Sequence, residues 1–348
     1  MSIFLRARMA EAPRVAMLGD VFVDMQADGV SGLPEWGMDR TAAAVHLLPG
    51  GSCANTARNL AGLARGALSV SLFSALGDDE LGRYFLRRVK EEGLLHSPES
   101  TLRLLPRVSQ SCCIILSGMK HVKPLGGLVR LDADRAMVSC YSSTSQLSVS
   151  ECAPELGDSE WALLHLGGYF NCPKLHTEDL LGLCRSVRSS GGIVSFDPQF
   201  DASEKWQGEG QHLHRLLSIV DVMLPSEIEA MGIAGTQESP NAAMEELSRR
   251  YPSALVVVKL GAKGAIAARG AERWKQPVFP TQVVDATGAG DAFDAGFLLQ
   301  FLLDNTNVEA ALRAGAAAGA ATVARSGACV NPLEGADIQF FLETSAGS

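Results

Sequence analysis

The sequence has no apolar run long enough to span a bilayer, and it does not begin with the basic-then-apolar pattern of a secretory signal peptide. Basic residues are also fewer than acidic ones, 30 against 39, which gives a formal net charge of -9. This balance argues against a groove that binds nucleic acid. We therefore expect a cytoplasmic protein with no membrane segment and no nucleic-acid partner.

Two common cofactor patterns are missing as well. The eight cysteines form no Cys-x-x-Cys pair and have no histidine at zinc-binding spacing, and most stand in apolar surroundings. This predicts reduced, buried thiols. The turn after the first apolar stretch, Gly19–Phe22, is not a Gly-x-Gly-x-x-Gly turn, so a dinucleotide-dependent oxidoreductase is not indicated.

The chain does contain a regular alternation of apolar strands and helices. Continuous apolar stretches, as at Arg14–Leu18, Trp161–Leu166 and Leu255–Leu260, are separated by segments with helical spacing such as Cys53–Arg65 and Thr177–Ser189. This alternation is typical of a mainly parallel sheet covered on both faces. With no internal repeat or low-complexity linker, residues 1–348 are predicted to form a single α/β domain.

Some parts of the sequence depart from this alternation. Residues 20–48 and 103–146 contain short β-rich pieces with Gly- or Pro-rich turns, including one at Pro124–Gly127, and together they predict a small separate sheet. A hairpin is predicted later in the chain, from Gly264–Arg269 and Arg273–Phe279.

The stretch Val283–Leu303 carries the clearest chemical signal. The tight turn of Gly288, Ala289 and Gly290 precedes a long apolar helix, and the free amides and dipole of such a helix start favour an anion. A carboxylate there, Asp291, is explained if it takes a proton from a hydroxyl while the amides stabilise a phosphoryl group. The alternative is an ordinary first-turn residue beside glycines that only close the turn.

Two separated motifs resemble signatures of the ribokinase-like (PfkB-type) carbohydrate kinase family. They are the segment from Gly50 to Leu63 and the segment Asp285–Asp291, more than two hundred residues later. The resemblance implies a three-layer α/β/α core with a small β-sheet lid, formed here by approximately residues 20–48 and 103–146. It also implies transfer of the γ-phosphoryl group of ATP to a primary hydroxyl, with Asp291 as base and Gly288, Ala289 and Gly290 as the amide turn.

The resemblance assigns sugar-binding roles near the first motif. Asp24 matches a carboxylate that accepts hydrogen bonds from sugar hydroxyls, and Asp20 is a weaker candidate of the same kind. Gly50 and Gly51 match a diglycine between lid and body, and Asn55 can both donate to and accept from a polyol. The residues alone leave alternatives open: Asp24 as a solvated strand residue and Asn55 as a helix-surface residue.

The resemblance also places the nucleotide and the ions. Glu227 is expected to organise Mg²⁺ through water, or else to be an ordinary helix-start residue. Asp285 and Thr287, with the segment 325–329, fall where many relatives hold K⁺. Asp294, in the helix after the turn, is expected to face solvent or a neighbouring amide. Nucleotide contacts are expected from Lys259, Gly261, Gly264 and Ser226.

These assignments predict a kinase that uses ATP and Mg²⁺ to phosphorylate a fructose-, ribose- or ketodeoxygluconate-like sugar. K⁺ is a further candidate cofactor. Gln199 to Asp201 stand where relatives that bind sugar acids often have a basic residue, which favours a neutral sugar. A nucleoside kinase of the same fold and a catalytically silent sugar-binding regulator stay as alternatives. Because lids of relatives often pair between subunits, a homodimer through the lid is expected.

Overall fold

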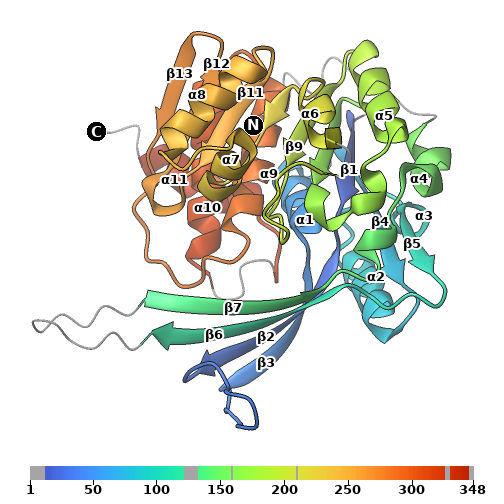
Figure 1. Cartoon of the computed structure of the whole chain (residues 1–348), viewed down its shortest axis with the longest axis vertical. Helices are drawn as coiled ribbons and strands as arrows, with labels where there is room; N and C mark the ends of the chain where they lie inside the picture. The colour runs from blue at the N-terminus through green and yellow to red at the C-terminus, as the bar shows by residue number, and fades with distance from the viewer. Residues whose placement is uncertain (1–11, 121–131, 158–159, 209–210, 326–329, 345–348) are drawn as a thin grey trace, which may run out of the picture.

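The computed structural model describes residues 12–120, 132–157, 160–208, 211–325 and 330–344. A large nine-stranded sheet has helices on both faces, and a small four-stranded sheet extends away from it (Figure 1). The predicted α/β fold is therefore confirmed. The predicted turn at Pro124–Gly127 lies outside the described residues. Among the described helices, none combines the length and apolar character needed to cross a membrane.

The large sheet is parallel from β5 to β11 and ends in an antiparallel hairpin, β12 and β13, as predicted. Its order is β13-β12-β11-β10-β9-β8-β1-β4-β5. Its strands are β1 (Arg14–Gly19), β4 (Ser69–Gly77), β5 (Leu102–Leu105), β8 (Leu163–Gly167), β9 (Ile193–Asp197), β10 (Val222–Met223), β11 (Leu255–Lys259), β12 (Ala265–Arg269) and β13 (Glu272–Gln276).

Both faces of the large sheet are buried, which explains why its strands are continuously apolar. In β1, Val15 and Met17 belong to one core, and Ala16 and Leu18 to the other. The first core is covered by α1 (Ser52–Ala64), α2 (Glu80–Glu92), α9 (Ala289–Leu303), α10 (Val308–Val323) and α11 (Gly335–Thr344). The second is covered by α4 (Val149–Leu156), α5 (Glu178–Ser189), α6 (His212–Leu217), α7 (Glu227–Ala234) and α8 (Pro240–Arg250). A short helix, α3 (Pro98–Thr101), precedes β5.

The small sheet has the order β3-β2-β6-β7. Its strands are β2 (Phe22–Val30), β3 (Ala44–Gly50), β6 (Cys112–Lys120) and β7 (Asp132–Cys140). Not all of the segment 103–146 joins it, because β5 pairs with β4 at the edge of the large sheet. The bounds predicted for this segment were approximate, and residues 103–105 lie in the large sheet as part of β5 (Leu102–Leu105).

The two faces of the small sheet differ in burial. One face carries Asp24 on β2 and, on β6, Cys113 and Ile115, which are buried. The opposite face carries a directly aligned apolar row across all strands: Leu47, Met25, Ile114 and Val138. Ile114 is 43% exposed and Val138 is 68% exposed. The outer face of the small sheet is therefore an open apolar surface.

Candidate active site

The site lies where the parallel strands of the large sheet end, the usual ligand-binding edge of an open α/β sheet. Asp20 follows β1, Asp197 closes β9 and Lys259 closes β11. The same edge receives the starts of α1 and α9, which meet through Asn55 and Asp291. The fold thus brings together five polar residues from distant parts of the chain.

Asp291 is positioned by the first turn of α9. Gly288 is the N-cap residue with φ of 71°, a left-handed conformation that glycine adopts without strain. Asp291 is 9% exposed, and its backbone carbonyl accepts a hydrogen bond from Thr56 Oγ1 at 3.3 Å. Burial raises the pKa of Asp291 to about 7, with Asn55 acting against that increase. A carboxyl group with this pKa can hold and release a proton near neutral pH.

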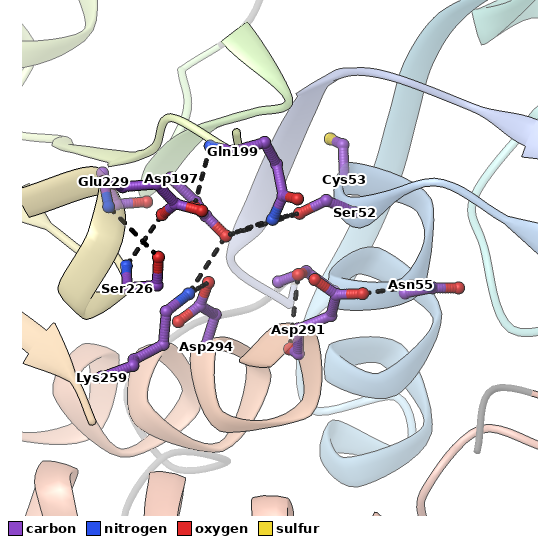
Figure 2. A network of polar contacts seen from close by, with 12 residues as sticks. Ser52, Cys53, Asn55, Asp197, Gln199, Ser226, Glu229, Lys259, Asp291 and Asp294 are labelled. Atoms are coloured by element: carbon purple, nitrogen blue, oxygen red, sulfur yellow. Dashed lines mark hydrogen bonds and ion pairs between the residues drawn. The ribbon is translucent and has the colours of Figure 1, made fainter. Parts of the chain in front are cut away.

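Asn55 connects α1 to Asp291. Its Nδ2 donates to Asp291 Oδ2 at 2.9 Å, which fixes the orientation of the amide (Figure 2). The other amide atom, Oδ1, is buried and accepts no hydrogen bond from the described residues. A buried acceptor without a hydrogen bond lowers the stability of the folded protein unless a ligand supplies a donor. Asn55 is therefore not the helix-surface residue of the alternative interpretation.

Asp24 lies close to the start of α1 and is partly buried. A Cβ built on Gly50 would lie 2.2 Å from Asp24 Oδ2, so only glycine allows the carboxylate to lie there. Gly51, with φ of 99°, is the N-cap residue of α1. The Asp24 side chain accepts no hydrogen bond from the described residues, and burial followed by the charge of Asp20 raises its pKa to about 7.

Asp20, in contrast, has both carboxylate oxygens in use. Oδ1 accepts from the Cys53 amide at 2.9 Å, and Oδ2 accepts from Asn171 Nδ2 at 2.8 Å. Burial raises the pKa of Asp20. These bonds tie the end of β1 to the start of α1. Asp20 thus has a structural function in the site, and its direct contact with a sugar stays a prediction.

Lys259 lies in a buried cluster with two carboxylates. Its Nζ contacts Asp197 Oδ2 at 3.1 Å and Asp294 Oδ2 at 2.8 Å (Figure 2). The expectation that Asp294 faces solvent or an amide was wrong, because its side chain is fully buried and ion-paired. No local pattern indicated this ion pair, since an Asp one turn into a helix is equally compatible with a surface position.

Asp197 also contacts the start of α1. Its Oδ2 accepts from Gln199 Nε2 at 3.2 Å, and the same amide donates to Ser52 Oγ at 2.8 Å (Figure 2). Gln199 thus stands where relatives that bind sugar acids often have a basic residue. Its side-chain amide bridges Asp197 and Ser52. No formal positive charge is contributed by this side chain.

Ser226 is the N-cap residue of α7. Its Oγ accepts a hydrogen bond from the backbone N–H of Glu229, and Glu229 Oε2 accepts one from the backbone N–H of Ser226 at 2.8 Å. The two bonds form a complete capping box. Glu229 is buried, and burial followed by the charge of Asp197 raises its pKa to about 7. Glu229 was missed, although the Ser-x-x-Glu spacing predicts a capping box. Glu227 lies outward, 3.8 Å from Lys263, and its link to Mg²⁺ stays a prediction.

The other predicted residues lie in two turns. Gly261 and Gly264 are in the turn between β11 and β12, where a Cβ on Gly264 would lie 2.0 Å from the carbonyl oxygen of Gln276. Asp285 Oδ1 accepts from the amide and hydroxyl of Thr287 at 2.8 and 2.6 Å. Residues 326–329 of the proposed K⁺ segment lie outside the described residues. Nucleotide and K⁺ contacts at these turns stay predictions.

A cavity of about 520 Å³ lies between the loop after β9 and the segment that contains Phe170 and His176. It is lined by Asn171, which holds Asp20, by Tyr141 at the end of β7, and by the loop after β9. Phe170 and His176 also line it.

Comparison with known proteins decides the family. The model of the pfkB family of carbohydrate kinases matches residues 13–101 and 142–334, most of the chain. The chain belongs to the pfkB family of carbohydrate kinases. The kinase is 26% identical over 288 residues to a fructokinase from Klebsiella pneumoniae, covering 82% of this chain and 83% of that one. Fructokinase and ribokinase relatives together indicate a sugar kinase.

Solved structures share the fold of the kinase. A ribokinase from Arabidopsis thaliana complexed with ribose and ATP has a TM-score of 0.75 at 20% identity, covering 95% of this chain and 99% of that one. A putative ribokinase II from E. coli in complex with ATP and Mg²⁺ has a TM-score of 0.76 at 21% identity, covering 96% and 99%. The ribokinase-like fold predicted from the two motifs is therefore confirmed.

A kinase of this family uses ATP, and the start of α9 is suited to its phosphates. Gly290 has no side chain, and the nearest atom to a Cβ built there is Lys259 Nζ at 3.7 Å. The backbone of the turn is thus open to an anion, while the helix dipole and a nearby ammonium both favour negative charge. Among the described residues there is no group of three or more His, Cys, Asp or Glu placed to hold a metal ion.

Proposed function

We propose that this kinase phosphorylates a primary hydroxyl of a small neutral sugar. The observation that carries the proposal is a pair of unused acceptors near the start of α1. They are the Asp24 carboxylate and Asn55 Oδ1, and neither accepts a hydrogen bond from the described residues. Sugar hydroxyls are donors that could satisfy both, and the bridging amide of Gln199 favours a substrate without a carboxylate.

In the proposed reaction ATP supplies the phosphoryl group. Asp24 and Asn55 orient the sugar so that its primary hydroxyl faces Asp291. Asp291 accepts the hydroxyl proton as the oxygen attacks the γ-phosphorus and the bond from that phosphorus to the leaving ADP breaks, and Asn55 Nδ2 holds the carboxylate in place at 2.9 Å. The amides of Gly288, Ala289 and Gly290 stabilise the charge on the transferred group without reorganising.

The proposed metal ions would act on the nucleotide side. Mg²⁺ would be held largely by phosphate oxygens and water, with Glu227 or Glu229 at the start of α7 orienting the water. Support for Mg²⁺ comes from the charge on the phosphates and from the position of α7 beside Asp197. K⁺ at Asp285 and Thr287 is a further proposal, which replacement of K⁺ by tetramethylammonium would test.

A phosphoryl-transfer screen tests the proposal. The kinase with ATP and Mg²⁺ is offered fructose, ribose, ketodeoxygluconate and a set of nucleosides, and sugar phosphate is detected by mass spectrometry. We expect kcat/KM to be highest for fructose or ribose. Preferred transfer to ketodeoxygluconate would contradict a neutral substrate, preferred transfer to nucleosides would support the alternative kinase, and binding of sugar without transfer would support a silent regulator.

We also propose a homodimer that buries the outer face of the small sheet. The row of Leu47, Met25, Ile114 and Val138 supports it, because contiguous exposed apolar side chains mark interaction surfaces. In this arrangement the small sheet would act as a lid whose inner face carries Asp24 and whose outer face contacts a second copy.

Replacing Val138 by aspartate is expected to dissociate this dimer. A carboxylate buried without a partner in the interface should raise the dimer Kd by about 100-fold or more. Sedimentation velocity at micromolar protein measures the change. Met137→Asp is the matched control, since Met137 is 62% exposed on the opposite face of the same strand. A wild-type monomer, or equal dissociation by both variants, would rule out this interface.

A further inference from the structure

Two cysteines stand directly opposite each other at one end of the small sheet. Cys112 is the first residue of β6 and Cys140 is the last residue of β7. They are partners in the antiparallel pairing of these strands, and the register continues without a shift to Lys120 and Asp132. The two strands lie side by side in Figure 1. Because opposed residues of an antiparallel pair share one face of a sheet, the two thiols are neighbours.

The spacing of such a pair suits a disulfide. Directly opposed residues have Cα atoms about 4.5 or 5.5 Å apart, and a disulfide accepts Cα separations of about 4.4 to 6.8 Å. The Cβ atoms of opposed residues are about 4.5 to 5.5 Å apart, against about 3.5 to 4.5 Å in a disulfide. Bond formation therefore needs a small approach of β7 to β6. Among the described strands, β7 is at the edge of the small sheet, where such a shift is least restricted.

The two thiols also differ from the other described cysteines in exposure. Cys140 is exposed and Cys112 is half-buried, whereas the remaining ones are buried: Cys53, Cys113, Cys152, Cys172 and Cys184. The expectation of buried thiols is therefore wrong for Cys140, which lies on an edge strand. Burial raises the pKa of Cys112, and Cys140 is the next largest cause, with Asp79 and Asp24 adding to the increase. Cys140 is thus the thiol that an oxidant in solution can reach first.

The pair lies between a fixed base and the row of the small sheet that carries Asp24. On one side, the Ser111 amide donates to Ser143 Oγ at 2.9 Å, and Ser111 Oγ accepts from the Thr144 amide at 3.0 Å. On the other side, the next residue of β6, Cys113, is aligned with Asp24. A covalent link in the row between them would displace β7 and restrict movement of the small sheet on its base. Such movement closes many active sites around a substrate.

We propose that Cys112 and Cys140 are a redox-sensitive pair, which forms a reversible disulfide across the small sheet and weakens the use of sugar when oxidised. The oxidant is a small disulfide. Cys140 Sγ, as thiolate, attacks one sulfur of this disulfide, forms a mixed disulfide and releases one small thiolate. Cys112 Sγ, as thiolate, then attacks Cys140 Sγ and releases the second. The protons lost by the two cysteines pass to the released thiolates through solvent, so two electrons move from the protein to the small disulfide.

Peptide mapping of the full-length kinase tests the bond. The protein is incubated with oxidised glutathione, free thiols are blocked with iodoacetamide, and the linked peptides are identified by mass spectrometry. We expect a Cys112–Cys140 link that dithiothreitol removes. The link should be absent from Cys140→Ser and present in Cys113→Ser, because Cys113 faces the other side of the sheet, where its Sγ accepts a hydrogen bond from Ser139 Oγ at 3.4 Å.

The same experiment is run on Val138→Asp, because Cys140 shares a face with the row proposed for the dimer. In this variant no second copy should cover the thiol. A link from Cys140 to Cys113, a mixed disulfide that does not resolve, or no link in either protein would overturn the inference. A disulfide-linked dimer on a non-reducing gel would also overturn it, since Cys140 would then pair with a second copy.

Kinetics test the consequence. Oxidation should lower kcat/KM for the preferred sugar by about threefold or more, because a restricted hinge changes kcat and KM together. Dithiothreitol should restore the value, and Cys140→Ser should not respond to oxidised glutathione. A complete disulfide with unchanged kcat/KM would overturn the effect on the sugar. This effect rests on the proposed function of Asp24: if no sugar is phosphorylated, the proposed function fails, whereas the peptide map still decides whether the pair forms its bond.

Discussion

Replacing Asp291 by asparagine is expected to lower kcat by about 10²- to 10⁴-fold, the usual contribution of a general base. An amide cannot take the hydroxyl proton, but it has nearly the same shape and can still accept a hydrogen bond from Asn55. ATP and sugar binding should therefore change little. Steady-state kinetics with the preferred sugar, together with calorimetric titration of ATP, distinguish loss of chemistry from loss of binding.

Stability measurements complete this test. Because burial raises the pKa of Asp291 to about 7, the folded state retains a proton that the unfolded state loses near pH 4. Ionised Asp291 therefore disfavours folding as pH rises from about 4 to 7, and Asp291→Asn should melt at or above the wild-type temperature at pH 8. Asp304→Asn, at the exposed far end of α9, is the control and should keep full activity. Turnover retained in Asp291→Asn would reject the base assignment.

The fold could be predicted because its signals are local. Continuous apolar strands such as Arg14–Gly19 alternate with amphipathic helices, and this pattern alone indicates a parallel sheet covered on both faces. The start of α9 was predictable for the same reason, since Gly288 and Asp291 stand within one turn. The approximate boundary predicted for the segment 103–146 falls within β5, because a run of four apolar or basic residues does not determine which sheet it joins.

The side-chain contacts of the site could not be predicted, because they join residues far apart in sequence. Lys259 and Asp294 are 35 positions apart, and Asn55 and Asp291 are 236 apart. No periodicity encodes such pairs. Asp294 was expected to face solvent or a neighbouring amide for this reason, and only the structure shows its ion pair with Lys259 at the end of β11. Glu229 differs, since its capping contact with Ser226 is local and was available from the sequence.

Replacing Asp24 by asparagine is expected to raise the KM for the sugar by about 10- to 100-fold, because hydrogen bonds to a charged group contribute about 1.5–3 kcal/mol. The unpartnered carboxylate beside Gly50 is the physical reason. kcat should fall less than KM rises, since Asp24 is not proposed to move a proton. Initial-rate measurements over a range of sugar concentrations at saturating ATP give both constants.

The wild-type KM should also depend on pH through Asp24. Burial raises the pKa of Asp24 to about 7, so below that pH the carboxylate is increasingly protonated and accepts sugar hydroxyls less well. KM should therefore rise as pH falls in the wild type and depend less on pH in Asp24→Asn. Asp28→Asn is the matched control, because Asp28 lies on the same face of β2 but already accepts a hydrogen bond from Gln26 at 2.9 Å. Equal KM changes in the two variants would show that charge on the small sheet, and not a contact at Asp24, controls sugar binding.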